Sequence, residues 1–398
     1  MHMAFTQEFW GYRRPDGQIG IRNRLAVIAA MDNVNPVARR IASLVRGAVA
    51  VTVPFGRGQT GLDKSRHDGA LAGLGRNPNF GAALVVSLEP RSAQALAEAI
   101  ALSGKDVEWL AVQPCGGTLK ATEQGVRLAV RLLGKASAQR REPAPLSELI
   151  IGAECGGSDT TSGITANPLL GMLGDFMVDA GATWILSETE EVVGAEQSLI
   201  ERAVTPEVAA RMKMVVKRME DQAIYQGTRV WPMSADNIAG GLTTLEEKAL
   251  GNVRKGGTRP LQEVLEYGER PTKKGLIFLD APAPGTENIT ALSISGAQMI
   301  LFSTGVGNPV GSPVSPTVKI TGNPATADSF ADNIDVNLGG ILSKEYSMEE
   351  GVEKLGAFMM EVASGRMTQS EMLGDTEIVV SPVDVSFLTH YHPEQPVL

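Results

Sequence analysis

Short apolar runs that alternate with helical patterns constrain the fold of this 398-residue chain more than any other feature. Such continuous runs of Val, Ile, Leu and Ala are typical of parallel strands that are buried on both faces. The first four lie at 25–31, 48–54, 82–90 and 107–113. Between them, 35–47 and 92–104 have helical spacing and close near a glycine, as helices often do. The alternation predicts an α/β domain.

A second alternation follows a polar, proline-bearing segment at 137–148, which is the candidate linker. Its expected strands lie at 148–154, 182–188, 275–281, 298–304, 317–321 and 377–381. An amphipathic helix expected at 206–227 packs on this second sheet. Because 398 residues exceed what one hydrophobic core usually fills, we predict two Rossmann-like parallel-sheet domains, 1–140 and 147–398, with a cleft between them.

Charge and composition exclude several classes of partner. The formal net charge of -9 argues against nucleic acid and against an anionic membrane surface. The sequence contains neither a run of about 18 apolar residues nor the apolar core of a signal peptide. Its two cysteines, Cys115 and Cys155, are too few for a disulfide scaffold and indicate a reducing compartment. We therefore expect a cytoplasmic protein, assembled as a homo-oligomer, whose ligands are small molecules.

Glycine-rich polar turns follow the expected strands, and the most reactive of them is ECGGSDTTSGITANP at 154–168. Ligands of open α/β sheets bind just outside the carboxyl ends of the strands, so these turns predict one shared cleft. Cys115 and Cys155 each begin a Cys-Gly-Gly sequence at such a turn. A cysteine alone is most often a small buried hydrophobe, which is how we interpret Cys115. The hydroxyl and carboxylate neighbours of Cys155 favour a functional thiol instead.

The histidines, the metal-ligand motifs and the carboxylates indicate which other kinds of catalytic or metal site this sequence supports. Outside the opening Met-His-Met, the histidines are His67, His390 and His392, which leaves a Ser-His-Asp mechanism poorly supported. A structural zinc site would need paired CxxC or clustered histidines, which the sequence lacks. Carboxylates are better supplied, because several glutamates crowd the turn after 182–188. Such acids can also be a solvated helix start that complements the dipole, so both interpretations stay open.

Seven motifs occur in order between about residues 10 and 345. They are GYRRPDGQIGIRN, CGGTLKATEQG, CGGSDTTSGITANP, SETEEVVGAE, GGLTTLEEKALG, KGG and LFSTGVGNPVGSPVSPTVKITGNP. Together they resemble the altronate and galactarate dehydratase family. The resemblance implies dehydration of a sugar acid, commonly with a divalent metal such as Fe²⁺, else Mn²⁺ or Mg²⁺. The large subunit of sulfolactate sulfo-lyase is similar to the same family. Longer members carry a small N-terminal domain that this chain lacks, which implies a separate small subunit.

Three loops depart from the pattern of that family. Its Pro-His-Gly-x-Gly-Cys-like loop reads PFGRGQ at 54–59, a Gly-Cys-Glu reads SLEP at 87–90, and Gly-Ala-Glu-His reads GAEQ at 194–197. Histidine and cysteine positions of the family are therefore replaced, so a metal-bound and a metal-free site both stay open.

We interpret the chain as a lyase that acts on a small anionic hydroxy acid. The expected reaction abstracts the α-proton, stabilises the enediolate and expels the β substituent as water, which gives a 2-oxo acid. A carbon–sulfur lyase that releases sulfite from a sulfolactate-like substrate is one alternative. A non-catalytic paralogue that only binds acids is the other.

The residue roles follow from this interpretation. Cys155 and Glu188 are the candidate metal ligands, and Glu188 is also a candidate catalytic residue. Lys248 or Lys120 is expected to be the base or the cation that stabilises the enediolate. The residues expected to bind substrate are Arg13, Arg22, Ser158, Asp159, Thr161, Ser162 and Asn167, with the two arginines on the far anionic group.

Overall fold

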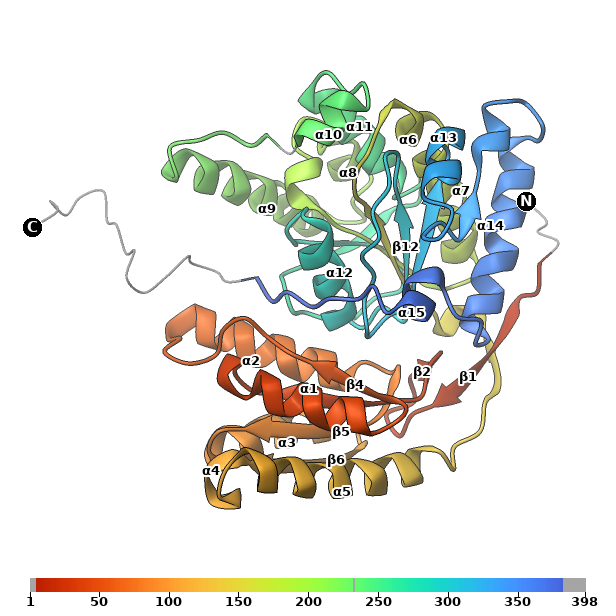
Figure 1. The fold of residues 1–398 in the computed structure, drawn as a ribbon. Helices are drawn as coiled ribbons and strands as arrows, with labels where there is room; N and C mark the ends of the chain where they lie inside the picture. Colours follow the sequence, from red (N-terminus) through yellow and green to blue (C-terminus); the bar gives the residue numbers. More distant parts are fainter. Residues whose placement is uncertain (1–4, 232, 382–398) are drawn as a thin grey trace, which may run out of the picture.

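The chain forms two parallel sheets and one small antiparallel sheet, which confirms the expected α/β class. The structure is a computed structural model and describes residues 5–231 and 233–381. The small parallel sheet and its helices, residues 24–136, form the small-sheet part, which is the lower part of Figure 1. The large parallel sheet and its helices, residues 150–373, form the large-sheet part above it.

The small parallel sheet has the strand order β4-β3-β5-β6. Its strands are β3 (Arg24–Ala29), β4 (Ala48–Val51), β5 (Phe80–Ser87) and β6 (Asp106–Ala111). All eight residues of β5 are buried, as its continuous apolar run predicts. Helices α1 (Asn35–Leu44) and α5 (Thr118–Ala136) pack on one face, while α2 (Gly61–Arg76) and α3 (Pro90–Ala101) pack on the other.

The large parallel sheet has the order β10-β11-β9-β8-β12-β13-β14. Its strands are β8 (Ile150–Cys155), β9 (Thr183–Leu186), β10 (Leu261–Leu265), β11 (Gly275–Leu279), β12 (Met299–Ser303), β13 (Thr317–Thr321) and β14 (Val336–Asn337). The central strand β8 pairs with β9 on one side and with β12 on the other. Strands β9, β10 and β11 lie on one side of β8, and the later strands β12, β13 and β14 lie on the other. The direction in which the chain adds strands therefore reverses between β8 and β12, which makes this pair the topological switch point of the sheet.

Helices and short turns surround this sheet. They are α6 (Thr160–Ile164), α7 (Ala166–Asp179), η3 (Thr189–Glu191), α8 (Gln197–Ile200), α9 (Pro206–Tyr225), α10 (Ala235–Ala239), α11 (Leu245–Arg254), α12 (Gly285–Ile294), α13 (Pro324–Ser329), α14 (Met348–Ala363) and α15 (Gln369–Leu373). Helix α9 confirms the amphipathic helix expected at 206–227. No helix among the described residues has the length and apolarity that crossing a membrane requires.

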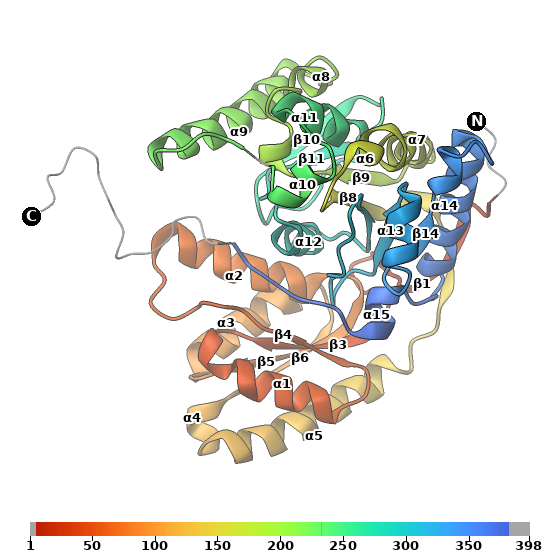
Figure 2. The same cartoon turned by 45° about the horizontal axis from the view of Figure 1, so that its top comes forward.

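Helix α12 lies between the large sheet and α2 of the small-sheet part, and both views agree on this arrangement (Figures 1 and 2). Gly73 of α2 allows the close approach, because a Cβ there would lie 2.7 Å from Cγ2 of Ile294. Next to this contact the buried Asn77 side chain donates to the carbonyl oxygens of Ser293 (2.9 Å) and Ala297 (3.0 Å). The two parts therefore share a packed, hydrogen-bonded interface.

One expected strand was wrong, and other elements were not predicted. Residues 377–381 are not a strand: Ile378 and Val380 are buried against the small-sheet core as irregular chain. The segment at 137–148 is more than a linker, because β7 (Glu142–Pro145) pairs with β1 (Glu8–Arg13) in the antiparallel sheet that β2 (Ile19–Gly20) completes. Strand β10 was not expected from the sequence at all. The domain boundaries stay a prediction.

Candidate active site

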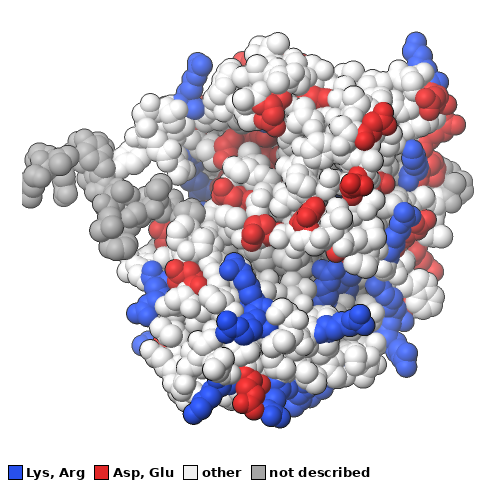
Figure 3. Space-filling model, viewed as in Figure 1, with Lys and Arg blue, Asp and Glu red and all other residues white. Residues whose placement is uncertain are grey.

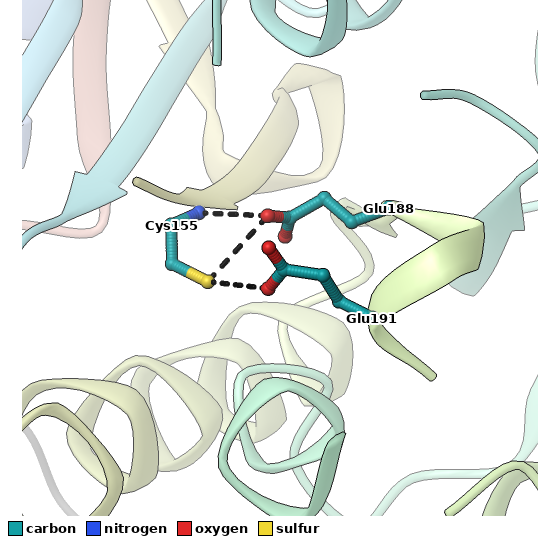
Figure 4. Close-up of side chains that lie close together, drawn as sticks. All are labelled: Cys155, Glu188 and Glu191. Carbon is teal, nitrogen blue, oxygen red and sulfur yellow. Dashed lines mark hydrogen bonds between the residues drawn. The ribbon is translucent and has the colours of Figure 1, made fainter. Parts of the chain in front are cut away.

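Cys155 ends β8 at the switch point and lies beside two buried carboxylates (Figure 4). Its Sγ is 3.5 Å from Oε1 of Glu188 and 3.3 Å from Oε2 of Glu191. Its backbone N–H also donates to Oε1 of Glu188 at 3.4 Å. The strand therefore delivers the thiol to the carboxyl end of the sheet, where ligands of such folds bind.

The two carboxylates come from the turn that follows β9. Glu188 adopts the left-handed conformation with φ 72° and ψ 68°, which a residue with a Cβ rarely adopts. The 3₁₀ turn η3 follows directly and places Glu188 and Glu191, three residues apart, on the same side. Glu190 between them turns away and accepts a hydrogen bond from the N–H of Ala283 at 2.9 Å. Strained backbone of this kind is concentrated at functional sites.

Helix α11 and its C-cap residue Lys255 supply the cations. Lys248, Asn252 and Lys255 recur at helical spacing and face the carboxylates. Lys248 Nζ lies 2.9 Å from Oε1 of Glu191, and Lys255 forms a fully buried ion pair with Glu188. Oδ1 of Asn252 is 3.9 Å from the sulfur of Cys155. One helix face thus holds both carboxylates by charge-assisted contacts.

Burial and neighbouring charges shift the pKa values of Cys155, Glu188 and Lys248. Burial, together with Glu188 and Glu191, raises the pKa of the Cys155 thiol. Burial raises the pKa of Glu188 to about 8, and Lys255 opposes this shift. Burial lowers the pKa of Lys248, but Glu191 and the other acidic groups outweigh it, so that the net shift is upward. Lys248 is therefore held as a cation rather than as a neutral base.

Cys155, Glu188 and Glu191 could hold a metal ion, because their ligand atoms all lie within 4.8 Å of one another. Three protein ligands leave open positions for a substrate, as catalytic metal sites require. Mg²⁺ prefers oxygen ligands alone, so a thiolate beside two carboxylates suits a softer divalent metal better. A divalent cation would also favour the thiolate that burial and the carboxylates disfavour.

A pocket of about 260 Å³ opens beside this cluster. It lies within the large-sheet part, so the cluster is not in the expected cleft between the two parts. A larger cavity of about 840 Å³ does lie between α2 and α9, and it includes Glu190. The smaller pocket is lined by Cys155, Ser158, Asp159, Thr160, Ser162, Gly163, Ile164, Asn167, Leu242, Glu247, Lys248, Leu250, Gly251 and Arg254.

The structure brings Ser158, Asp159, Ser162 and Asn167 to this pocket, whereas Thr161 is not among its lining residues. Their polar atoms are largely bonded to the protein itself. Oδ1 of Asp159 accepts from the N–H of Ser162 at 2.9 Å and from the Thr161 hydroxyl at 2.7 Å. The Asn167 amide donates to the carbonyl of Gly251 and accepts from the Ser303 hydroxyl. These residues shape the wall more than they offer free hydrogen bonds.

Arg13, Arg22 and Lys120 do not reach the pocket. Arg13 on β1 pairs with Glu142 on β7, and buried Arg22 makes two hydrogen bonds of 2.8 Å to Glu371. Lys120 is an exposed residue of α5 in the small-sheet part. These guanidinium and ammonium groups belong to other elements, so the geometry gives their expected substrate roles no support.

Glu191 was expected only as one of the glutamates that crowd the turn after 182–188, and Lys255, Asn252 and Arg254 were not predicted. The spacing of three between Glu188 and Glu191, and of four and seven along α11, was the available signal. Cys115 packs partly buried against the small-sheet core, as expected of a small hydrophobe. His67 is buried with its ring nitrogen 3.1 Å from the carbonyl of Ala30. His390 and His392 lie outside the described residues.

The fold and the site define an α/β protein with a thiol–carboxylate centre at a sheet switch point. Residues 11–137 match the family described as D-galactarate dehydratase/Altronate hydrolase, second domain. Residues 146–385 match D-galactarate/Altronate dehydratase, C-terminal. The chain therefore belongs to the galactarate and altronate dehydratase family, a family of lyases, which confirms the resemblance that its motifs indicated.

Curated relatives cover most of the chain. The (2R)-sulfolactate sulfo-lyase subunit beta of Chromohalobacter salexigens is 36% identical over 94% of this chain and 97% of its own length. The altronate dehydratase of Bacillus subtilis is 34% identical over 94% of this chain and 78% of its own. The galactarate dehydratase (L-threo-forming) of Escherichia coli is 33% identical over 90% of this chain and 73% of its own.

Proposed function

We propose that the chain is a lyase that removes a β substituent from a small hydroxy acid and yields a 2-oxo acid. The observation that carries this proposal is the buried group of Cys155, Glu188 and Glu191, held by two lysines beside an open pocket. Transfer of the α-proton to a base leaves an enediolate. The β substituent then departs with its bonding electron pair, a hydroxyl as water once it gains a proton, and the remaining enol tautomerises to the 2-oxo acid. Dehydration, in which water leaves, is the first form of the proposal.

Lys248 supports the enediolate in this proposal. Lys248 lines the pocket, and Glu191 and Oδ1 of Asn237 (2.8 Å) hold its ammonium group in place. A positioned cation stabilises negative charge as that charge develops, which is worth about 3 kcal/mol for one well-placed donor. The ion pair with Glu191 keeps this lysine protonated, so the geometry favours the cationic role over the role of base.

Cys155, Glu188 and Glu191 would hold a divalent metal, with Fe²⁺ as the proposed ion and Mn²⁺ as the alternative. Such an ion supplies Lewis acidity toward a substrate carboxylate or hydroxyl. Lys255 keeps Glu188 oriented through its buried ion pair. The backbone N–H of Cys155 fixes the same carboxylate from the strand side.

A carbon–sulfur lyase that releases sulfite is the second candidate. Two observations favour it: the match to the sulfo-lyase subunit spans 97% of that relative, and the pocket offers few free groups for a polyhydroxylated chain. Because that relative is named as a subunit, we also propose that this chain acts with a separate small subunit. A homo-oligomeric assembly and a cytoplasmic location stay predictions.

The test begins with elemental analysis of anaerobically purified protein. A 2-oxo-acid assay over sugar acids and sulfolactate, with and without Fe²⁺, follows, and sulfite is measured in parallel. We expect Cys155→Ala to lose both metal and product, whereas the matched control Cys115→Ala, in the other Cys-Gly-Gly sequence, keeps both. A Cys155→Ala protein with full metal and turnover would remove the cluster from the mechanism. Wild-type protein that binds no metal would favour the acid-binding paralogue, whereas metal without turnover would indicate that the proposed small subunit is required.

A further inference from the structure

Arg254 is a cation at the pocket without a partner in the part of the chain that the structure describes. It lines the pocket, it is exposed, and no hydrogen bond or ion pair engages its guanidinium at 5–231 or 233–381. The other charged groups of the pocket are engaged. Lys248 is paired with Glu191, and Oε2 of Glu247 accepts from the Thr243 hydroxyl at 2.9 Å. The oxygens of Asp159 accept from α6 and from Asn323.

Helix geometry explains why Arg254 faces the pocket while its neighbours face the cluster. At about 100° per residue, Glu247 and Arg254 are separated by about 20° around the axis of α11, so they share one stripe. Lys248, Asn252 and Lys255 form the adjacent stripe that holds Glu188 and Glu191. Helix α11 therefore presents Lys248 both to the cluster, where it pairs with Glu191, and to the pocket, whereas the guanidinium of Arg254, unpaired among the described residues, meets the pocket alone.

The remaining wall limits what can occupy the pocket. Ile164, Leu242 and Leu250 contribute apolar surface, while the polar groups of Asp159 and Asn167 are bonded within the protein. Ser158 and Thr160 also line the pocket, but two hydroxyls replace only part of the hydrogen bonds to water that a long polyhydroxylated chain would lose there, which is costly. A short acid with an anionic group at each end would find a cation for each, because buried Lys248 and exposed Arg254 both line the pocket. A guanidinium is well suited to a carboxylate or a sulfonate, because its planar fork binds two oxygens at once.

We propose that Arg254 forms a second anion subsite of this pocket, so that the substrate is a short acid with two anionic groups. This inference rests on the proposed function, since it concerns the same pocket. It assigns to Arg254 the anchoring role that sequence reasoning gave to Arg13 and Arg22, both of which are paired elsewhere.

Binding measurements test the subsite without turnover. Tartronate and lactate are three-carbon 2-hydroxy acids with two and one carboxylates, and neither has a β substituent to eliminate. Isothermal titration calorimetry of the full-length chain should show tighter binding of tartronate. Arg254→Met should weaken tartronate binding about tenfold or more and leave lactate nearly unchanged. Arg254→Lys, which keeps the charge but not the fork, should lie between them. Arg40→Met is the matched control, an exposed arginine of α1 in the small-sheet part.

The outcomes separate this inference from the proposed function. Equal binding of the two acids by the wild type, or an unchanged preference in Arg254→Met, overturns the subsite and leaves the lyase proposal intact. Binding of neither acid by the wild type contradicts the acid pocket itself. Arg254→Glu provides a second variant: it should weaken tartronate binding more than Arg254→Met does, and equal effects would also overturn the subsite.

Discussion

Lys319 is fully buried on β13, and its ammonium group has no hydrogen-bond partner within the described part of the chain. Its Nζ lies 3.2 Å from the ring centroid of Phe302. Phe302 is the neighbour in register of both Lys319 and Glu154, whose carboxylate oxygens are equally buried and unpartnered. Burial lowers the pKa of Lys319 to about 7 and raises that of Glu154 well above its usual range. Burial in this row across three strands therefore favours the uncharged forms of Lys319 and Glu154.

Replacing this lysine should change how stability depends on pH. The pKa of Lys319 is about 7 in the folded state and about 10.4 when unfolded, so the unfolded chain binds the extra proton between these values. Wild-type stability consequently gains up to about 1.4 kcal/mol per pH unit from this group as pH rises through that window. Lys319→Met lacks this gain. Its stability relative to wild type should be highest at or below pH 7 and should decline toward pH 10.

Urea unfolding at several pH values measures this difference. Lys213→Met is the matched control, because Lys213 is an exposed residue of α9, and its stability difference from wild type should be small and flat with pH. A flat difference for Lys319→Met as well would mean that Lys319 keeps an ordinary pKa in the folded protein.

At the scale of elements, Asp159 acts as the N-cap of α6 although its sequence indicated a substrate ligand. It forms a capping box with Ser162, and its other oxygen accepts from the Asn323 amide at 2.8 Å. Asn323 is itself the N-cap of α13. One carboxylate thus fixes two helix starts at the carboxyl ends of β8 and β13.

Asp159→Ala should therefore lower stability more than it lowers acid binding. Loss of an N-cap costs about 1 to 2 kcal/mol, and the freed Asn323 amide adds to that cost. Urea unfolding and calorimetry with tartronate check the two effects. Thr205→Ala, at the N-cap of α9, is a control that loses a cap without touching the pocket. A variant of Asp159 with intact stability and strongly weakened binding would restore the substrate role.

Strands and long helices could be predicted from local pattern, whereas their partners could not. The run at 317–321 and the helix at 206–225 carry their own burial pattern, so both were found. The run at 377–381 is equally apolar, but it fills the interface without a strand partner, which local pattern cannot distinguish. Strands β1 and β7 pair across more than a hundred residues with no local signal.

Some residues of the candidate site could likewise be predicted from local pattern, and others could not. Cys155 and Glu188 were predicted because Cys155 ends one strand and Glu188 follows another strand of the same sheet, and the carboxyl ends of parallel strands meet at one edge. Lys255 and Arg254 depend on how α11 docks, which spacing alone does not fix. The partners of Arg13 and Arg22 lie 129 and 349 residues away, so the sequence offered no sign that these guanidiniums were already engaged.

At the scale of the whole molecule, charge is unevenly distributed on the face that Figure 3 shows. In the view of Figure 3 the basic side chains gather over the small-sheet part and the acidic side chains over the large-sheet part. Opposite fields favour contact between the two parts, although exposed charges are screened by salt. Buried contacts are screened far less, so they carry the stronger link between distant parts of the chain.

Glu371 provides such a buried link. Its carboxylate accepts two hydrogen bonds of 2.8 Å from Arg22, it also pairs with Arg24, and its side chain is 1% exposed. The same carboxylate completes the capping box of α15 with Thr368. The contact therefore ties the chain just before β3 to the last helix that the structure describes.

Glu371→Gln should destabilise the protein by about 3 to 5 kcal/mol near neutral pH, because it leaves two largely buried guanidiniums without their counter-ion. Burial raises the pKa of Glu371, but Arg22 and Arg24 outweigh it, so the net shift is downward. Because the pKa of Glu371 is lower in the folded protein than the value of about 4.3 in the unfolded chain, its contribution to stability is complete above that value. The contribution is lost as pH falls through the lower pKa of the folded protein. The difference in stability between wild type and variant should therefore be constant from about pH 6 to 8 and shrink in acid.

Glu361→Gln, which breaks an exposed pair with Arg366, should cost at most about 1 kcal/mol and serves as the control. Urea unfolding across this pH range decides the matter: a Glu371→Gln loss no larger than that of the control would mean that α15 is held by its cap and packing rather than by these ion pairs.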